Sequence, residues 1–364
     1  MELCEFIEGK AIIEVPKFEK VTAKTPVFYN PKMAFSRDIS ISVLNTIKLK
    51  ESKKVIDGLS GSGIRGIRYI LESNSEVCFN DHNPVATKLI EKNLKLNSLE
   101  ATVTKSDFNH VHGKFEVVDI DPFGSPVRFL DGAFRILKNN SYLFLTATDT
   151  SALTGAHVSS CRRKYDSKPL NCSFTHELAV RILIGKVVRN AAKYNLAVRP
   201  ILSYTKEHFI RAYFEVRCGK EKTNKALNNL GFALKCKCGF RKTTNSFISV
   251  CPNCSEKILF SHPIWISNIK DNEFVKNCVK EYESRDFLSD KPLNLLKIIE
   301  GEIDVPLFYD IHELSHIYKI KIPKTEEIIK KLKELGFDAS ATHFSPVSVK
   351  TNADINDVLR CLYG

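Results

Sequence analysis

The chain has 364 residues, of which 43% are hydrophobic and 26% are charged, and its formal net charge is +12. This length suits two or three domains with well-formed cores. No apolar run approaches the roughly 18 to 20 residues of a transmembrane helix, and residues 1–10 lack the pattern of a signal peptide. We therefore expect a soluble, cytoplasmic protein that makes no use of a membrane.

The chain alternates strands and helices from residue 53 onward. Hydrophobic patterning predicts strands at 53–57, 76–81, 101–105, 115–121 and 142–147, helices at 64–71, 84–96, 126–137 and 174–194, and a final strand pair at 196–204 and 209–217. This alternation is typical of an α/β fold with a doubly wound, mostly parallel, Rossmann-like sheet. In such a sheet the ligand binds at the carboxyl ends of the strands.

The sheet is predicted to end near Cys218, and the polar, Lys-rich residues 219–235 read as a linker. A cysteine cluster at 236–254 follows. Amphipathic helices at 311–320 and 325–335 and an extended segment at 344–351 are compatible with a winged-helix-like module. We therefore predict a cofactor-binding domain with an N-terminal extension at 1–220 and a C-terminal α+β domain at 221–364.

The positive charge is concentrated in one part of the chain. Residues 161–260 hold 20 Lys and Arg against 6 Asp and Glu, whereas the remainder is close to neutral. A uniformly lysine-rich surface would spread the excess evenly. A localised basic region instead indicates a polyanionic partner, with nucleic acid favoured. No obligate protein partner is evident.

A glycine-rich loop at 57–66 joins the first strand to the first helix. It begins at Asp57, and Gly61 and Gly63 open a G-x-G-x-x-G match that lets the backbone approach a nucleotide closely. Asp81 ends the second strand, where a carboxylate accepts the ribose hydroxyls of an adenosine. Because NAD sites use the same features, the loop does not distinguish a methyltransferase from an oxidoreductase. Asp107, after the third strand, either reads the adenine amino group or caps a helix.

The turn Asp121-Pro122-Phe123-Gly124 follows the fourth strand and carries the chemistry. An exocyclic base amine is a poor nucleophile because its lone pair is delocalised into the ring. A carboxylate at Asp121 would accept an N–H hydrogen bond from such an amine, and Phe123 would stack on an extruded base. The alternative is a simple type I turn.

Four of the 11 cysteines form two close pairs, Cys236-x-Cys238 and Cys251-Pro-Asn-Cys254, which suit a structural zinc site. The one-residue gap in the first pair is short. Either Cys236 is not a ligand, or the turn is distorted, or Cys218 replaces it.

A second metal motif, His312-Glu313-Leu314-Ser315-His316, matches the H-E-x-x-H signature of zinc proteases. The sequence has no third-ligand pattern downstream, so we interpret it as one face of a surface helix.

Several segments together resemble the tRNA (guanine-26, N2)-dimethyltransferase family in its compact archaeal form. The matching segments are Val27-Phe28-Tyr29-Asn30-Pro31, Ser36-Arg37-Asp38, the loop 57–68, Asn80-Asp81, Ser106-Asp107, Asp121-Pro122-Phe123-Gly124, His262-Pro263-Ile264-Trp265 and the run 305–310. Ser36 replaces the usual Asn of the second segment. The matches span most of the chain.

The resemblance implies a class I methyltransferase that transfers methyl groups from S-adenosyl-L-methionine to N2 of guanine 26 in tRNA. It assigns cofactor contacts to Arg37, Arg65, Asp81, Asp107 and Phe108, the base pocket to Phe28, Asp121 and Phe123, and zinc to the cysteine cluster. Three alternatives remain: a methyltransferase for another RNA or DNA, a nucleotide-binding oxidoreductase, and a non-catalytic zinc protein that binds RNA.

Overall fold

The computed structural model describes residues 3–17, 27, 29–49 and 53–363. Its centre is a seven-stranded sheet in the order β5-β4-β3-β6-β7-β9-β8. The first five strands are parallel. Strand β9 runs antiparallel to β7, and the edge strand β8 runs antiparallel to β9 and therefore in the direction of the first five. The strands are β3 Lys54–Asp57, β4 Glu76–Asn80, β5 Thr102–Thr104, β6 Phe115–Ile120, β7 Leu137–Ala147, β8 Leu196–Lys206 and β9 Phe209–Cys218. The predicted doubly wound sheet is confirmed.

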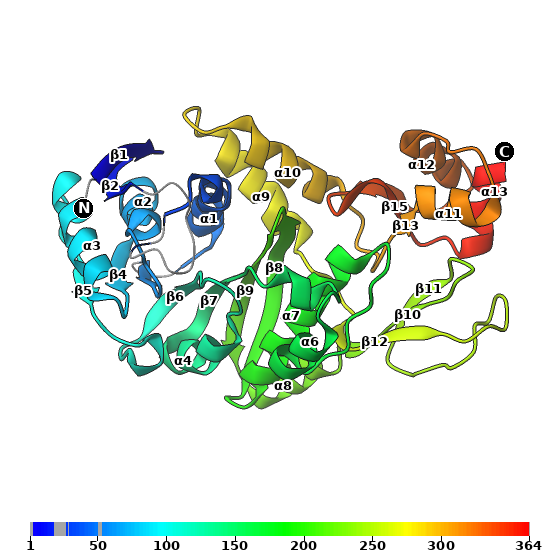
Figure 1. Cartoon of the computed structure of the whole chain (residues 1–364), viewed down its shortest axis with the longest axis horizontal. Helices are drawn as coiled ribbons and strands as arrows, with labels where there is room; N and C mark the ends of the chain where they lie inside the picture. Colours follow the sequence, from blue (N-terminus) through cyan, green and yellow to red (C-terminus); the bar gives the residue numbers. More distant parts are fainter. Residues whose placement is uncertain (1–2, 18–26, 28, 50–52, 364) are drawn as a thin grey trace.

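Helices cover both faces of this sheet (Figure 1). One face carries α4 Leu130–Ile136, α5 Thr150–Leu153, α6 Val158–Tyr165 and α7 Thr175–Ala192. The other face carries α1 Ala34–Thr46, α2 Ile64–Ser73 and α3 Pro84–Leu96, with α9 Asn272–Glu283 and α10 Asp290–Gly301. Successive residues of the central strand β6 serve the two cores, since Val117 packs in the second and Val118 in the first.

An N-terminal hairpin, β1 Leu3–Glu8 and β2 Ala11–Pro16, packs on α2 and α3. The side chain of Asn93 on α3 receives the backbone N–H of Glu14 at 2.8 Å, and that of Asn97 receives Ile12 at 2.9 Å. These bonds hold the hairpin against α3.

The predicted linker at 219–235 is wrong. This segment forms α8 Lys220–Leu227 and β10 Leu230–Lys235. Strand β10 lies at the centre of a three-stranded antiparallel sheet with β11 Arg241–Thr244 and β12 Leu259–Trp265. Helix α8 reads as a linker because only its narrow face, with Ala226 and Leu227, reaches the core.

The chain returns to the first unit after this small sheet. Helices α9 and α10 follow β12 and pack in the same core as α1, with Val275, Cys278 and Leu296 buried there. A single boundary at residue 220 does not anticipate this return, because it assigns these two helices to the C-terminal domain.

The last part of the chain forms its own small core. Its elements are β13 Tyr309–Asp310, α11 Ile311–Tyr318, α12 Thr325–Glu334, β14 Ala339–Thr342, β15 Ser345–Thr351 and α13 Ile355–Tyr363, and its sheet has the order β13-β15-β14. The two predicted helices and the extended segment lie where they were expected. Strands β13 and β14 and helix α13 were not predicted.

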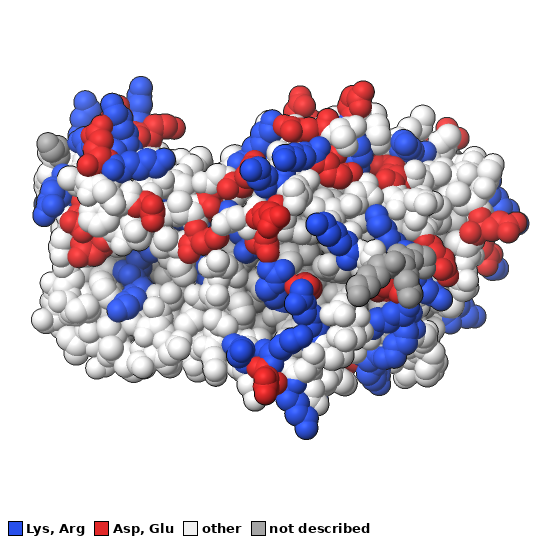
Figure 2. All heavy atoms as spheres, turned by 180° about the vertical axis from the view of Figure 1, so that it is seen from behind, with Lys and Arg blue, Asp and Glu red and all other residues white. Residues whose placement is uncertain are grey.

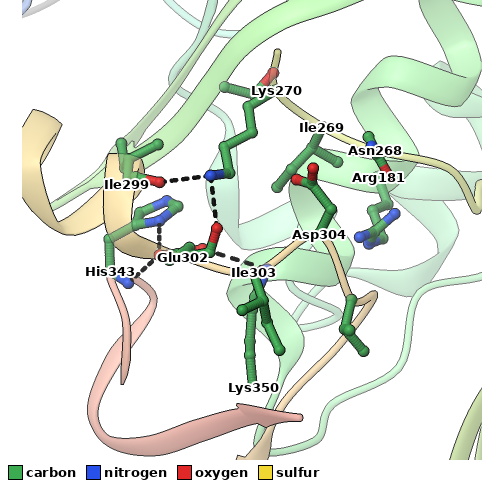
Figure 3. Close-up of a pocket in the computed structure, with 12 residues that line it drawn as sticks. Arg181, Asn268, Ile269, Lys270, Ile299, Glu302, Ile303, Asp304, His343 and Lys350 are labelled. Carbon is green, nitrogen blue, oxygen red and sulfur yellow. Dashed lines mark hydrogen bonds and ion pairs between the residues drawn. The ribbon is translucent and has the colours of Figure 1, made fainter. Parts of the chain in front are cut away.

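A buried chain of charges joins this C-terminal module to α7 around a small cavity (Figure 3). Lys350 on β15 lies 3.4 Å from Glu177 on α7 and 3.3 Å from Glu302, which also receives His343 Nδ1 at 2.6 Å. Arg181 pairs with Glu177 at 2.7 Å. Because these groups neutralise one another, we assign the cavity a structural role.

Within the described part of the chain, no helix is both long and apolar enough to cross a membrane.

Candidate active site and cysteine cluster

The glycine-rich loop lies between β3 and α2, at the carboxyl edge of the parallel strands. Gly61 (φ 54°) and Gly63 (φ 82°) adopt left-handed conformations that disfavour other residues. Gly66 faces β4, where a Cβ atom would overlap the Phe79 ring. The loop therefore has the tight turn, open backbone and close helix–strand contact of a nucleotide-binding loop.

Asp81 and Phe108 support this loop. Asp81 Oδ2 accepts the N–H of Gly61 at 2.9 Å, and its Oδ1 accepts that of Asn83 at 2.9 Å. Phe108 is buried directly under the loop, and a Cβ at Gly58 would come within 2.7 Å of its ring. Asp81 is thus held at the loop, whereas Phe108 acts from beneath it.

Asp107 is exposed and caps a short helical turn, because its side chain accepts the N–H of Asn109 at 2.8 Å. Of the two roles considered for Asp107, binding the adenine or capping a helix, the capping role describes its hydrogen bonds in this structure. The same N–H bond is the main reason why the pKa of Asp107 lies below its usual value.

Two arginines and three carboxylates meet where β3 and β6 end. Arg211 on β9 binds Asp119 through two hydrogen bonds of 2.8 and 2.7 Å, and Tyr69 donates its hydroxyl to the same carboxylate at 2.6 Å. Arg65, on the first turn of α2, forms an ion pair with Asp121 and lies 3.7 Å from Asp119. The helix after the glycine-rich loop and the turn after β6 are therefore directly connected.

This environment sets the ionisation of the carboxylates. Burial acts to raise the pKa of Asp121, but the charges of Arg65 and Arg211 outweigh it and hold the pKa below the usual value. Burial and the neighbouring charge of Asp119 raise the pKa of Asp57 to about 7. Asp121 is consequently ionised at neutral pH, which makes it a hydrogen-bond acceptor and only a weak base.

The turn after β6 presents an aromatic ring to solvent. Gly124 has a φ of 103°, its N–H bonds Thr148 Oγ1 at 2.6 Å, and its carbonyl receives the Thr148 N–H at 3.0 Å. These bonds fix the turn so that Phe123 remains 63% exposed beside Asp121. Phe28, the other predicted aromatic of the base pocket, lies outside the described residues.

Arg37 lies apart from the glycine loop in this structure. Its guanidinium bonds Glu8 at 2.6 and 2.5 Å and the carbonyl of Asn30 at 3.1 Å. Arg68 joins the same group through Glu8 at 2.9 Å and Asp38 at 2.7 Å. The structure thus groups Asp57, Gly61, Gly63, Arg65, Asp81 and Asp121, and places Arg37 in a second buried network.

Sequence reasoning missed the residues that organise the first network. Ser40 Oγ lies 2.8 Å from the Tyr213 hydroxyl and receives both Arg65 and Arg211 at 3.1 Å. Ser40 carries no sequence signal. Arg211 does, because a charged residue inside an apolar strand is rarely buried without a partner.

The four predicted cysteines converge. Their sulfur atoms all lie within 4.8 Å of one another, with Cys236 Sγ 3.4 Å from Cys254 Sγ and Cys238 Sγ 3.7 Å from Cys251 Sγ. A tetrahedral zinc site with Zn–S bonds of about 2.3 Å has sulfur–sulfur edges of about 3.8 Å. The donor set therefore fits zinc.

The short spacing of the first pair is resolved by its backbone. Gly239, with φ 86°, closes the turn, and the Cys236 N–H bonds the carbonyl of Phe240 at 2.9 Å. Both pairs therefore contribute to one cluster, and Cys218 lies elsewhere, exposed at the end of β9.

The H-E-x-x-H motif lies on α11 with His312 and His316 exposed, while Glu313 pairs with Lys235 at 2.5 Å. In the part of the chain that the structure describes, only the four cysteines form a group suited to a metal. The surface-helix interpretation holds.

Strand order and site together define the class of protein. A dinucleotide-binding sheet has the strand order 3-2-1-4-5-6. With β3 counted as the first strand, this sheet has the order 3-2-1-4-5-7-6, because β9 is inserted antiparallel between β7 and β8. With a glycine loop after β3 and an Asp-Pro-Phe turn after β6, this is a Rossmann-like methyltransferase.

Comparison with known proteins narrows the class. The family model described as N2,N2-dimethylguanosine tRNA methyltransferase matches residues 9–363. The tRNA (guanine(26)-N(2))-dimethyltransferase of Methanothermobacter thermautotrophicus is 38% identical to this chain, over 98% of each sequence. The enzyme of the same name from Pyrococcus abyssi is 41% identical, over 97% of each sequence. The structure of Trm1 from Pyrococcus horikoshii with S-adenosyl-L-methionine is 39% identical, has a TM-score of 0.89 and covers 99% of this chain and 100% of its own.

This chain therefore belongs to the N2,N2-dimethylguanosine tRNA methyltransferase family. Membership removes the oxidoreductase alternative.

Proposed function

We propose that this protein transfers methyl groups from S-adenosyl-L-methionine to the exocyclic N2 of a guanine in tRNA, at position 26 as in its named relatives. The observation that carries the proposal is the ion pair between Arg65 on the cofactor helix and Asp121 in the catalytic turn. It brings the two halves of a methyl-transfer site into contact. This tRNA substrate is also why we retain the cytoplasm as the expected location.

The charge of the site supports S-adenosyl-L-methionine as the cofactor. Asp57, Asp119 and Asp121 outnumber the two guanidiniums of the network, so the site is acidic or neutral overall. Such a site favours a cationic sulfonium over the anionic pyrophosphate of a dinucleotide. The cofactor supplies an electrophilic methyl group. We propose Asp81 for the ribose hydroxyls, the loop at Gly61 and Gly63 for the backbone approach, and Asp107 for the adenine.

The chain's own part in the reaction centres on Asp121. Arg65 donates to Asp121 Oδ2, which leaves the other oxygen to accept an N2–H of the guanine. This hydrogen bond orients the nitrogen toward the methyl group and raises its electron density. As the new C–N bond forms, the bond between the methyl group and the sulfonium sulfur would break and S-adenosyl-L-homocysteine would leave. The nitrogen becomes cationic and its N–H acidic, so even a weakly basic carboxylate takes the proton.

A second round uses the same groups. The monomethylated amine retains one N2–H, which rotation about the exocyclic bond brings to Asp121. Phe123 supplies an exposed ring on which the guanine stacks during both transfers. We propose the same stacking role for Phe28, as the family resemblance implies.

We propose a structural zinc ion held by Cys236, Cys238, Cys251 and Cys254. The N–H of Asn253 approaches Cys251 Sγ at 3.4 Å, and its side-chain amide approaches Cys238 Sγ at 3.5 Å. Such donors offset the negative charge of thiolate ligands. Four cysteines leave no open coordination position, so the metal takes no part in methyl transfer.

We further propose a division that differs from a single cut at residue 220. The methyltransferase unit comprises the sheet and the helices up to α8, together with α9 and α10. The tRNA-binding parts are the cysteine-containing sheet and the C-terminal module. The strand order β13-β15-β14 around α11 and α12 is compatible with a winged-helix-like module.

The test is to incubate the purified protein with an unmodified tRNA transcript and labelled S-adenosyl-L-methionine, and to analyse nucleosides by mass spectrometry. N2,N2-dimethylguanosine in the wild-type transcript, and its absence when guanine 26 is replaced by adenine, is the expected result. Methylated DNA with unmodified tRNA would refute the substrate assignment.

A further inference from the structure

An exposed aromatic cluster lies on the cysteine-containing sheet. The Phe232 ring contacts the rings of Phe247, Phe260 and His262, and Phe247 also contacts Phe260, with centroid distances of 4.0 to 6.1 Å. Phe247 is 46% exposed. The apolar side chains of Ile248 and Val250, close to it in sequence, and of Leu259, next to Phe260, are also exposed. An apolar surface of this kind on a small module marks an interaction site.

Basic side chains border this cluster. Lys168 Nζ lies 4.0 Å above the Phe260 ring. Lys242 and Lys257, on the same small sheet and its connecting loop, are exposed. Aromatic rings interleaved with Lys and Arg are typical of surfaces that bind single-stranded or looped RNA, because rings stack on bases while cations contact phosphates.

Helix α6 connects this cluster to the catalytic turn. At one end, Tyr165 receives a hydrogen bond of 3.0 Å from Ser125, which directly follows the turn. Just beyond α6, Lys168 bonds backbone to backbone with His262 on β12 at 3.0 Å, and Ser261 donates to the Lys168 carbonyl at 2.6 Å. Figure 1 shows α6 on the face of the sheet that carries α7, close to β12.

Two arginines of α6 form no ion pair with any residue that the structure describes. Arg162 and Arg163 are exposed, and among the described residues neither has an acidic partner. The neighbouring cations differ, because Lys164 pairs with Asp149 at 3.0 Å and Lys186 pairs with Asp166. Exposed, unpaired guanidiniums are suited to phosphate contacts.

We infer that Arg162 and Arg163 on α6 and the Phe247 side of the cysteine-containing sheet form one RNA-binding surface, the α6–Phe247 surface. It holds the body of the tRNA while the target guanine occupies the turn at Phe123. This inference rests on the proposed function and adds which part of the chain grips the substrate.

Two other groups of basic residues are less suited to such a surface. Helix α8, with Lys220, Lys222 and Lys225, starts where β9 ends at Cys218, which is the rim of the sheet opposite the catalytic turn. Around the C-terminal helices, charges of both signs alternate, as the upper left of Figure 2 shows. The positive charge of residues 161–260 is therefore divided, and α6, unlike α8, lies on the side of the sheet that carries the catalytic turn.

The test compares matched pairs of full-length variants. The double variant Arg162→Ala/Arg163→Ala removes two positive charges from the α6–Phe247 surface, and Lys220→Ala/Lys222→Ala removes two from α8. Phe247→Ala truncates an exposed ring of the surface, and Phe287→Ala truncates one that is 48% exposed outside it. The measurements are S-adenosyl-L-methionine affinity, tRNA affinity at several salt concentrations, and kcat and KM for methylation of tRNA.

For the α6 double variant we expect tRNA affinity to fall about tenfold, the slope of log affinity against log salt to decrease by about one to two, and KM to rise with kcat retained. For Phe247→Ala we expect a loss of about fivefold to tenfold with an unchanged salt slope. The α8 and Phe287 controls should match the wild-type protein, and all variants should bind the cofactor normally.

The inference is overturned if the α6 and Phe247 variants retain wild-type KM and salt dependence, which would assign the surface to a protein partner, or if the α8 variant shows the larger loss. Either result requires a wild-type protein that methylates tRNA. A wild-type protein that leaves tRNA unmodified refutes the proposed function itself and is therefore distinguishable.

Discussion

Replacing Lys350 by methionine tests the charge chain that joins the C-terminal module to α7. The Lys350 side chain is 3% exposed, and its ammonium lies 3.4 Å from the buried carboxylate of Glu177. The carboxylate of Glu302, also buried, lies 3.3 Å away on the cavity shown in Figure 3. Methionine preserves the length and the apolar stem of the side chain. The substitution therefore removes the charge without opening a large cavity, and leaves Glu302 with His343 as its partner.

The size of the effect follows from the geometry. At 3.3 to 3.4 Å and an effective dielectric constant of about 20, each pair contributes about 5 kcal/mol of Coulomb energy. Most of this is offset by the cost of burying the three charges, so the net loss on removing one partner is about 3 to 5 kcal/mol. With an unfolding entropy of about 2.1 cal/mol/K per residue, this loss lowers the unfolding midpoint of a chain of this size by roughly 4 to 7 °C.

The loss of stability at acid pH gives an independent measure of this charge chain. The charges of His343 and Lys350 outweigh the effect of burial and lower the pKa of Glu302 from 4.5 to about 2. A depressed carboxyl pKa adds stability that is complete above pH 4.5 and is lost as pH falls toward 2, worth about 3 kcal/mol. Without Lys350 this pKa rises, so stability should begin to fall at a higher pH.

The assay is thermal and urea unfolding of both proteins from pH 7 to 3. The matched control is Lys330→Met, because Lys330 forms an exposed i,i+4 pair with Glu334 whose loss should cost under about 1 kcal/mol. A Lys350→Met midpoint no lower than that of the control would refute a stabilising role for the buried chain.

The remaining predictions concern the site. Asp121→Asn should slow methylation by about a hundredfold or more with tRNA affinity retained, because the amide no longer accepts the proton; single-turnover assays decide, and full activity would remove the assigned role. Phe123→Ala should lower kcat/KM by roughly tenfold to a hundredfold through lost stacking while the unfolding midpoint stays constant, since the ring is 63% exposed. Cys254→Ser should reduce bound zinc, measured by elemental analysis, from one equivalent and destabilise the protein, whereas Cys218→Ser, outside the cluster, should leave both unchanged; equal zinc content in both variants would argue against the site.

The sequence predicted the parts of the fold that depend on short-range patterns. The central strands are nearly continuous apolar runs bounded by Gly and Asp, and the glycine loop needs only its own residues and the strand and helix that flank it. The turn at Asp121 was predicted for the same reason. Each of these features is formed by residues that are close together in the chain, so its chemistry can be inferred from the sequence without the fold.

Elements defined by distant partners were not predicted. Helices α9 and α10 follow the cysteine cluster in the chain but pack on α1, more than 200 residues earlier. Strand β10 resembles a linker in sequence because it is short, contains Gly231 and ends at Lys235, and only pairing with β11 and β12 defines it. Local composition carries no information about such partners.

Asp119 and Asp121 show the same limit within the candidate site. The two carboxylates are two residues apart, and nothing local distinguishes them. Asp119 is fully buried, and its charge is neutralised by Arg211, which lies 92 positions later in the chain. Asp121 remains partly exposed and pairs with Arg65.

The difference in partners divides the work between these two carboxylates. Because Asp119 also approaches Arg65 at 3.7 Å, it helps to hold the guanidinium that orients Asp121 and keeps its pKa low. Loss of Asp119 should therefore disturb the site through position and charge, whereas loss of Asp121 removes the acceptor itself. The family motif points to this turn, and the distant Arg211 explains why the acceptor that we propose is the second aspartate and not the first.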